Sequence, residues 1–184
     1  ATYNFDEKYL LMASVRREAS SKFVGANQPW GTFPALSVGW RINKESFMSG
    51  LDFINDLKLR AGYGVTGTAP DASFLGVSRL GYNGYFLSTG TWVPTLVPSS
   101  NPNPYLRWEE KHETNVGADF SLFKGRISGS IDYYNRLTKG LLYDYPVPSP
   151  PNLYSTTTAN VGTMQNKGIE IMINLIPVQK KNFV

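Results

Sequence analysis

The chain has 184 residues, a formal net charge of +4, no cysteine, and aromatic residues at 14% of its composition. The absence of cysteine excludes disulfides, thiolate metal sites and cysteine nucleophiles, and the modest charge argues against a nucleic-acid binder, which needs a concentrated basic face. The longest uninterrupted apolar run covers only residues 9–13, far short of the roughly 20 that a membrane-spanning helix requires.

Six segments alternate between apolar and polar residues, which is the pattern of a β-strand with two different faces. We predict strands near residues 7–17, 34–42, 56–64, 108–122, 126–138 and 167–176. In the fifth segment Ile127, Ile131 and Tyr133 share one side, whereas Ser130 and Asp132 share the other. The alternation alone allows either a soluble sheet with a buried oily face or a membrane barrel whose oily face meets lipid.

The connections between these segments fall into two groups. In an up-and-down sheet, the long connections at 17–29, 64–107 and 143–166 lie at one end, and those at 43–56 and 123–126 lie at the other. The two longest are uncharged over 80–106 and 145–166. Short turns at one rim and long loops at the other are typical of outer-membrane barrels.

Two local features lead to further expectations. The 43–56 connection is expected to hold one short helix, with Phe47, Leu51 and Ile54 on one face. Pro34 indicates an edge, a bulge or a later start within the second strand, because proline cannot donate to a ladder.

The predicted strands are too few to close a barrel, since single-chain barrels begin at about eight strands. The last residues, 180–184, have the composition of the start of another strand. We therefore expect an all-β, antiparallel, up-and-down segment of about six strands from a larger transmembrane barrel. A smaller complete outer-membrane barrel is disfavoured by the strand count. A soluble or secreted carbohydrate-binding β-sandwich stays open as the main alternative.

Several stretches match a known family in family order and together cover nearly the whole chain. They are "LLMASVRREASSKF", "WGTFPALSVGWRI", "DLKLRAGYGVTGT", "NPNPYLRWEEKHETNVGADFSLFKGRISGSIDYYNRLTKGLL" and "NVGTMQNKGIEI". The sequence resembles the C-terminal part of the barrel of SusC/RagA-family TonB-dependent outer-membrane transporters. The loops at 72–100 and 146–158 carry the weakest match.

The resemblance implies a barrel of roughly 22 strands, located in the outer membrane of a Gram-negative, Bacteroides-type cell. It implies import of oligosaccharides or peptides, with a SusD-like surface lipoprotein as a lid, contact with TonB through an N-terminal segment, and a dimer of transporter–lipoprotein pairs. Residues 1–184 are then expected to be a partial barrel domain with extracellular loops at 64–107 and 143–166, and with the plug domain absent from this stretch.

The barrel interpretation assigns the two faces of the strands to different surroundings. The residues expected to face the lumen are Arg16, Arg60, Asp119, Asp132 and Glu170. The residues expected to face lipid are Leu36, Val38, Trp40, Ile127, Ile131, Tyr133, Ile169, Ile171 and Ile173. The lumen charges could line a polar conduit, or they could simply pair with one another.

Aromatic residues in the uncharged loops are the candidate ligand-facing or lid-facing groups: Tyr82, Tyr85, Trp92 and Tyr154. Aromatic rings stack on sugars, but packing of the loops on themselves would explain the same residues.

The sequence predicts no enzyme. The adjacent Glu109 and Glu110 point to opposite faces of a strand, so they cannot flank one bond as a glycosidase pair must, and His112 is the only histidine. We expect no catalytic residue, no metal, no cofactor and no nucleic-acid partner.

Overall fold

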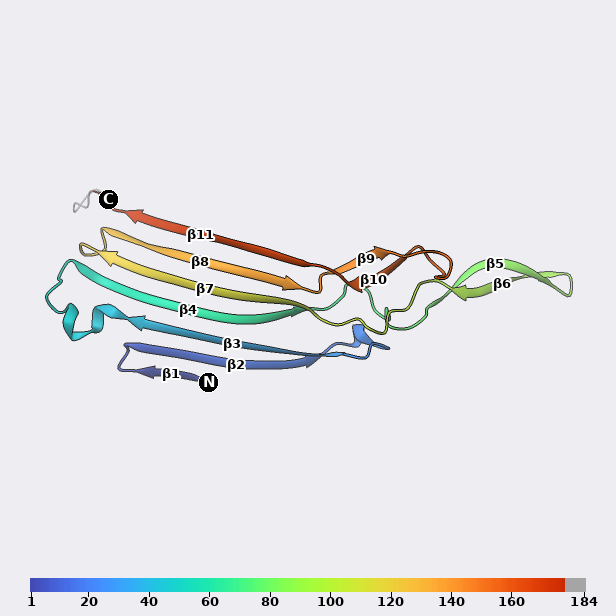
Figure 1. Cartoon of the computed structure of the whole chain (residues 1–184), viewed down its shortest axis with the longest axis horizontal. Coiled ribbons are helices and arrows are strands. Elements are labelled where there is room, and N and C mark those ends of the chain that lie inside the picture. The colour runs from blue at the N-terminus through green and yellow to red at the C-terminus, as the bar shows by residue number, and fades with distance from the viewer. Residues whose placement is uncertain (178–184) are drawn as a thin grey trace.

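The computed structural model describes residues 1–177, which form eleven strands and three short 3₁₀ helices (Figure 1). The strands are β1 (Thr2–Phe5), β2 (Tyr9–Ala19), β3 (Trp30–Arg41), β4 (Ile54–Thr68), β5 (Leu80–Ser88), β6 (Thr91–Pro98), β7 (Glu109–Leu122), β8 (Ile127–Lys139), β9 (Leu142–Pro146), β10 (Thr156–Asn160) and β11 (Thr163–Leu175). The 3₁₀ helices are η1 (Ser21–Phe23), η2 (Ile42–Lys44) and η3 (Ser46–Met48).

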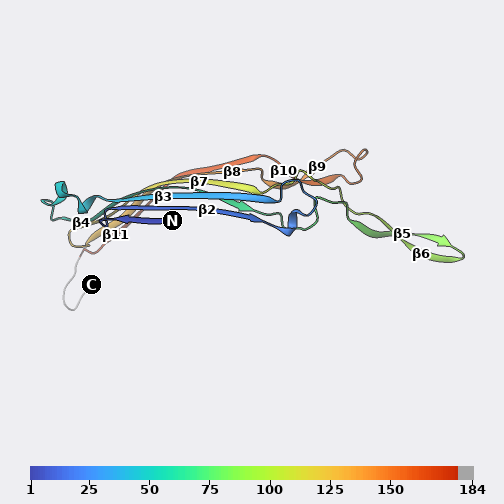
Figure 2. The ribbon, with the colours of Figure 1, turned by 90° about the horizontal axis from the view of Figure 1, so that it is seen from below.

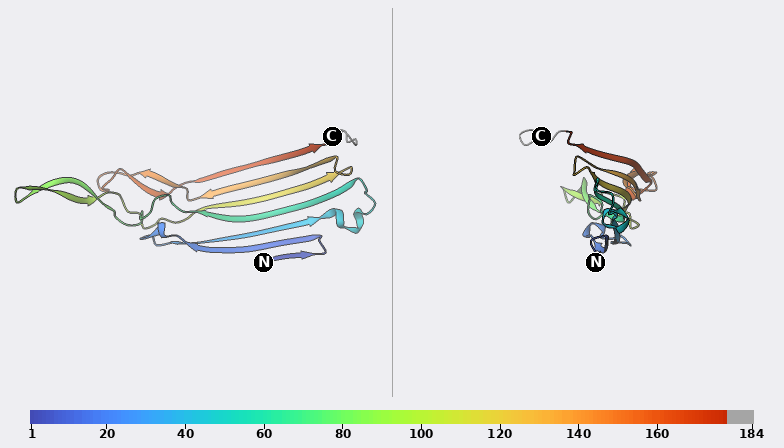
Figure 3. Two further views of the ribbon diagram at one scale, coloured as in Figure 1. Left: turned by 180° about the vertical axis from the view of Figure 1, so that it is seen from behind. Right: turned by 90° about the vertical axis from the view of Figure 1, so that its left-hand side faces the viewer.

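Seven strands build one antiparallel sheet in the order β1-β2-β3-β4-β7-β8-β11. The sheet is a single curved layer, as the edge view in Figure 2 and the end view in Figure 3 show. The remaining strands form two separate hairpins, β5–β6 and β9–β10, which branch from the same end of the sheet (Figure 1). Among the described residues no second sheet covers either face, so the β-sandwich alternative is wrong for this part of the chain.

The two ends of the sheet differ in their connections. At one end the strands are joined through residues 6–8, 42–53 and 123–126, and at the other through 20–29, 69–108 and 140–162. The 69–108 connection contains β5–β6 and the 140–162 connection contains β9–β10. We call these ends the turn end and the loop end.

The expected short helix at the turn end is not α-helical. The backbone there makes i to i+3 bonds, with the Glu45 amide donating to the Ile42 carbonyl at 2.9 Å and the Met48 amide to the Glu45 carbonyl at 3.0 Å. These bonds produce η2 and η3, whereas Ile54 already begins β4. A segment this short favours 3₁₀ turns over a costly α-helical nucleus.

Pro34 lies where β3 has lost one of its neighbours. It pairs with Val15 of β2, but the pairing of β3 with β4 reaches only as far as Ala35. The missing amide is therefore tolerated because this part of β3 is a local edge. Strand β1, which pairs with β2, was not predicted, and the strand start expected at 180–184 lies outside the described residues.

Buried side chains gather at the loop end. The cluster, called the loop-end core below, consists of Phe23, Phe33, Val65, Leu75, Leu106 and Trp108. Elsewhere large apolar side chains stand open on the sheet. Within residues 1–177 no helix has the length and hydropathy needed to cross a membrane.

Candidate functional site

The register of the sheet places every predicted face residue in one of two sets. Residues directly opposite one another on paired strands share a face, and one such row across six strands is Leu10, Gly39, Arg60, Gly117, Asp132 and Glu170. A neighbouring row of the opposite face is Leu11, Val38, Ala61, Val116, Tyr133 and Ile169. The five residues expected in the lumen share the first face, called the polar face below. The nine expected at lipid share the second, called the apolar face.

The charges at the centre of the polar face pair with one another. Arg60 Nη2 lies 2.7 Å from the Asp132 carboxylate, and its Nε lies 3.2 Å from both oxygens of Asp119. A third contact joins Arg60 Nη1 to Asn115 Oδ1 at 3.3 Å. One guanidinium thus joins β4, β7 and β8, an arrangement that favours mutual pairing over a free conduit for these residues.

Gly117 provides the space for this network. A Cβ on Gly117 would lie 2.3 Å from Asp132 Oδ1 and 3.0 Å from Arg60 Cζ. Any larger residue would therefore displace the ion pair. The arrangement depends on a small residue at one register position of β7.

Other charges of the polar face are also paired, nearer to the loop end. Arg136 Nε lies 3.1 Å from the Glu113 carboxylate and its guanidinium stacks over Tyr134 at 4.7 Å from the ring centroid. Arg16 pairs with Glu18 on its own strand. Because these pairs are partly exposed, each contributes little stability, on the order of 0–1 kcal/mol.

The loop-end core fixes the bases of the 20–29 and 69–108 connections, and Leu142 at the start of β9 packs against it. The ring of Trp108 lies 5.1 Å from that of Phe23 and 5.4 Å from that of Phe33, measured between centroids. Its indole Nε1 donates to the Pro29 carbonyl at 3.0 Å. The 20–29 and 69–108 connections are also joined by the Asn27 amide, which donates to the Pro104 carbonyl at 2.8 Å.

Three asparagines join the 69–108 connection to the 140–162 connection. The Asn101 side chain donates to the carbonyls of Tyr154 at 2.7 Å and Thr156 at 2.9 Å, and it accepts from the amides of Leu153 and Tyr154. Asn103 donates to the Thr158 carbonyl at 2.9 Å. Asn160 exchanges bonds with the backbone of Arg107 and also donates to the Gly140 carbonyl at 2.9 Å. We call this set the asparagine clamp.

A groove of about 750 Å³ lies between these two connections. Its lining is mostly polar and includes Asp71, Arg79, Asn101, Asp144, Tyr154 and Thr156. Several of these groups already have partners: Tyr154 donates its hydroxyl to the Pro98 carbonyl at 2.7 Å, and Asp144 accepts from Thr158 at 2.6 Å. The groove is large enough for a small polar ligand, but its tyrosine is also a structural contact.

The four candidate loop aromatics do not converge on one site. Tyr82, Tyr85 and Trp92 lie on the β5–β6 hairpin, which extends beyond the rest of the loop end (Figure 1). Tyr154 lies in the other long connection, against the groove.

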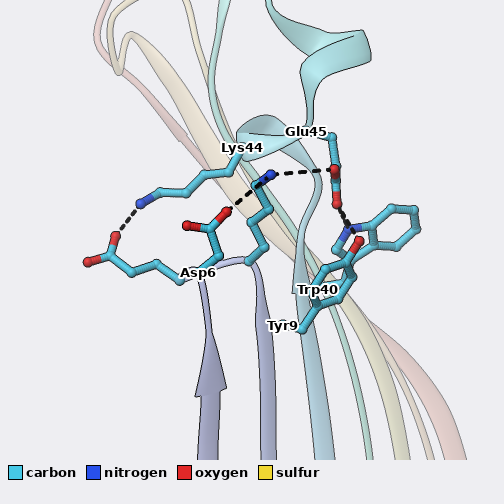
Figure 4. A network of polar contacts seen from close by, with 7 residues as sticks. Asp6, Tyr9, Trp40, Lys44 and Glu45 are labelled. Atoms are coloured by element: carbon cyan, nitrogen blue, oxygen red, sulfur yellow. Dashed lines mark hydrogen bonds and ion pairs between the residues drawn. The ribbon is translucent and has the colours of Figure 1, made fainter.

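A second polar network lies at the turn end (Figure 4). Glu45 accepts from the Tyr9 hydroxyl at 2.6 Å and from the Trp40 indole at 3.0 Å, and Lys8 lies 3.9 Å away. These contacts, led by the Tyr9 hydrogen bond, hold the pKa of Glu45 below its ordinary value of 4.5. The hydrogen bond and the charge of Lys44 likewise lower the pKa of Glu7. The rings of Tyr9 and Trp40 are thereby oriented over the apolar face.

The residues considered for catalysis are engaged in structural contacts. Glu109 accepts a hydrogen bond from the Leu142 amide at 3.0 Å. His112 lies between the Tyr63 hydroxyl at 2.9 Å and the Glu110 carboxylate at 3.2 Å. Within residues 1–177 no group of three acidic or histidine side chains is placed to hold a metal ion.

A family model described as "TonB dependent receptor-like, beta-barrel" matches residues 1–175. The chain belongs to this family. It is 41% identical over 182 residues to TonB-dependent receptor P39 of Formosa agariphila, covering 98% of this chain and 17% of that protein. It is 36% identical over 186 residues to TonB-dependent receptor SusC of Bacteroides thetaiotaomicron, covering 98% of this chain and 18% of that protein.

Solved structures with a similar fold include the RagAB peptide importer in its "closed-closed" and "open-open" states. The TM-score is 0.86 in both cases, at 28% identity, over 98% of this chain and 19% of the matched chain. The resemblance to SusC/RagA-family transporters is confirmed by these matches. The chain spans less than a fifth of the length of these relatives, so its sheet is a segment of a TonB-dependent receptor barrel wall.

Sequence reasoning missed the asparagine clamp. The available signal was the Asn-Pro-Asn-Pro run at 101–104, in which two prolines stiffen the backbone and leave two asparagine side chains free to bond elsewhere. Nothing in the local sequence indicates that their partners lie about fifty residues further along the chain.

Proposed function

We propose that this chain forms part of the wall of an outer-membrane, TonB-dependent importer of oligosaccharides or peptides in a Bacteroides-type cell. The observation that carries the proposal is the two-faced sheet whose two long, hairpin-bearing connections, 69–108 and 140–162, lie at the same end. That arrangement suits a wall whose apolar face meets lipid and whose polar face lines the lumen. The family match supports the importer, and no chemistry is assigned to the chain.

The proposed partners follow from the same relatives. A SusD-like surface lipoprotein would sit over the loop end, TonB would act through a part of the protein outside these residues, and two transporter–lipoprotein pairs would form a dimer. The long connections lack charge over 80–106 and 145–166, and the groove between them is mostly polar. These features support a hydroxyl-rich or amide-rich ligand, and so they fit both an oligosaccharide and a peptide.

Import is tested by uptake in cells that lack the full-length receptor and in cells complemented with it. Fluorescent oligosaccharide pools and oligopeptide pools are supplied separately, and accumulation should require both the receptor and TonB. The importer proposal fails if the complemented and deleted cells accumulate neither pool differently.

The assignment of the two faces is tested by a matched pair of charges on neighbouring residues of β8. Ile131→Arg places a cation on the apolar face at mid-strand, which should cost roughly 2–4 kcal/mol at the bilayer midplane. Ser130→Arg places the same cation on the polar face and should be tolerated. The amount of folded receptor in the outer membrane, read from its heat-modifiable gel mobility, should fall for the first variant only. The reverse result would mean that the faces are exchanged.

A further inference from the structure

The apolar face of the sheet changes to cations at the side of the loop end. On three strands, the first charged residue of this face, counted from the turn end, is an arginine or a lysine. These residues are Arg17 on β2, Lys139 on β8 and Lys167 on β11. We call them the cationic belt.

The residues next to the cationic belt follow the order of a membrane surface. Tyr63 and Tyr133 lie on the apolar face between the aliphatic residues and the belt. The guanidinium of Arg17 lies 5.1 Å from the ring centroid of Trp30, which belongs to the same face and is 59% exposed. Aromatic rings and long basic side chains are enriched where hydrocarbon gives way to headgroups, because their stems are apolar and their ends are polar.

The belt cations are exposed and have no acidic partner in the part of the chain that the structure describes. All three side chains are exposed, and the ion pairs formed within residues 1–177 do not include them. The acid of the apolar face at this end is Glu110, which lies 3.2 Å from His112. Glu110 is the register partner of Lys139 but forms no ion pair with it.

The charges at the turn end are arranged differently. Lys8 lies 3.3 Å from Asp6, and Lys44 pairs with Glu7 (Figure 4). Acids and bases therefore neutralise one another at this end, whereas the cationic belt leaves positive charge uncompensated at the other. Such a difference between the two rims suits a membrane whose two leaflets differ in charge.

The spacing of the belt favours a layer of anionic groups over one small anion. Between β2 and β8 lie four strand spacings, or about 19 Å at ~4.8 Å each. Lys167 pairs with Asn135, four residues from Lys139, which places the two lysines about 13 Å apart along the strands. A single phosphate ion cannot bridge such distances, but neighbouring lipid headgroups can each meet one cation.

The position of the belt identifies which lipid would meet it. If the apolar face lies in hydrocarbon, the next residues towards the loop end lie among the headgroups of the outer leaflet. In a Gram-negative outer membrane this leaflet consists of a phosphorylated glycolipid, lipopolysaccharide. A lysine or arginine near an anionic lipid surface contributes about 1 kcal/mol of attraction.

We propose that the cationic belt binds the phosphate groups of the glycolipid in the outer leaflet. The proposal rests on the proposed function, because it requires the apolar face to meet lipid with the loop end outside the cell. It assigns a lipid preference to three residues that take part in neither the polar face nor the groove.

Glycolipid binding is tested with the full-length receptor in nanodiscs that contain phosphatidylethanolamine and lipid A. The belt variant combines Arg17→Gln, Lys139→Gln and Lys167→Gln. The matched control combines Arg16→Gln, Lys111→Gln and Arg136→Gln, which removes the same charge from the polar face at the same end. Heat-modifiable gel mobility checks that each variant is folded, and native mass spectrometry counts the lipids that stay bound.

The belt variant should retain less lipid A relative to phosphatidylethanolamine, by at least about fivefold, whereas the control should change it by less than about twofold. Lys139→Arg combined with Lys167→Arg should retain lipid A as wild type does. Retention by the belt variant at the wild-type level would overturn the proposal. Equal losses in the belt variant and the control would assign the effect to net charge and would also overturn it.

A second lipid separates phosphate recognition from acyl-chain packing. Wild-type receptor in nanodiscs with dephosphorylated lipid A should retain the glycolipid only as weakly as the belt variant does with lipid A. If the phosphorylated and dephosphorylated forms are retained equally, the acyl chains hold the lipid and the cationic belt does not.

Failure of this proposal is distinguishable from failure of the proposed function. If Ile131→Arg reduces the folded receptor as expected while the belt variant binds lipid A like wild type, only the cationic belt is wrong. If Ile131→Arg is tolerated and Ser130→Arg is not, the assignment of the faces is wrong and the belt proposal fails with it.

Discussion

The hairpins β5–β6 and β9–β10 branch from the same end of the same sheet, yet they differ in the side-chain contacts that support them. Two members of the asparagine clamp, Asn101 and Asn103, reach the backbone of the β9–β10 hairpin from the neighbouring connection. The third, Asn160 of β10, bonds back to Arg107 and to Gly140.

The β5–β6 hairpin receives one such bond in residues 1–177, at its base, where the Tyr154 hydroxyl donates to the Pro98 carbonyl at 2.7 Å. Its side chains Tyr82, Tyr85 and Trp92 are exposed. The difference shows that one hairpin is fixed along its length by the neighbouring connection, whereas the other is fixed mainly at its base.

The largest loss of stability is expected from a substitution in the loop-end core, against which the bases of both hairpins pack. Leu106 is fully buried in the loop-end core, and Leu106→Ala would leave a cavity that costs about 2–5 kcal/mol. Hydrogen exchange of the full-length receptor should quicken in both the 69–108 and 140–162 connections. Protection that is lost in only one of them would show that the hairpins do not share this base.

The next largest loss of stability should affect the β9–β10 hairpin and leave the β5–β6 hairpin unchanged. Asn101→Ala removes four bonds to the backbone of residues 153–156, and the released groups should cost roughly 1–3 kcal/mol in local stability. Amide exchange at Leu153 and Tyr154 should quicken about tenfold or more, with β5–β6 unchanged. The matched control Asn83→Ala, in the β5–β6 hairpin, should leave the exchange rates of these amides as in wild type.

A smaller loss of stability is expected from a substitution at Gly84, in the β-bulge where the register of β5 with β6 shifts between Tyr82 and Tyr85. Gly84→Val forces a β-branched residue into a left-handed conformation, at a cost of about 1–2 kcal/mol. The β5–β6 amides should exchange faster while β9–β10 keeps its protection. Gly90→Asn, at the hairpin turn with a φ of +84°, should cost less because asparagine tolerates that conformation. Equal effects of both substitutions would argue against the bulge as the sensitive position.

The smallest effect should leave both hairpins untouched. The folded-state pKa of Glu45 is lowered, so its contribution to stability is present above its ordinary pKa of 4.5 and is lost as the pH falls through the folded value. Below about pH 4.5, exchange in the 42–53 connection should quicken more than at the loop end. Glu45→Gln should reduce this pH dependence to the part that Glu7 contributes through Lys44. An undiminished pH response in the variant would assign the effect to another group.

The sequence alone predicts the long strands of the main sheet and their two faces, because the apolar and polar residues of a strand alternate every two residues. Ile127, Ile131 and Tyr133 were placed together by alternation alone, and the register keeps them on one face. Alternation gives no such signal in the β5–β6 hairpin, which lies in a stretch that the sequence predicts as a loop. There Tyr82 and Tyr85 are out of phase, and the register shift between them places both on one face.

The structure of the long connections is also hard to predict from the sequence for a second reason. Pro94 and Pro98 argue against a central strand, but they are compatible with β6, which pairs with β5 alone in the part of the chain that the structure describes. The asparagine clamp depends on contacts across about fifty residues, which local propensity cannot reveal. The four residues of β1 are too few for periodicity to identify.

The register also gives the tilt of the strands relative to the barrel axis. On β2 the apolar band runs over Tyr9, Leu11, Ala13 and Val15, and on β8 it runs over 127–133, but the hydrogen-bonded row that contains Tyr9 meets β8 at Ile131. The band has therefore slipped by four residues across four strand spacings. At ~3.3 Å per residue and ~4.8 Å per strand, this slip corresponds to strands inclined by roughly 35° to the barrel axis, within the range that closed barrels adopt.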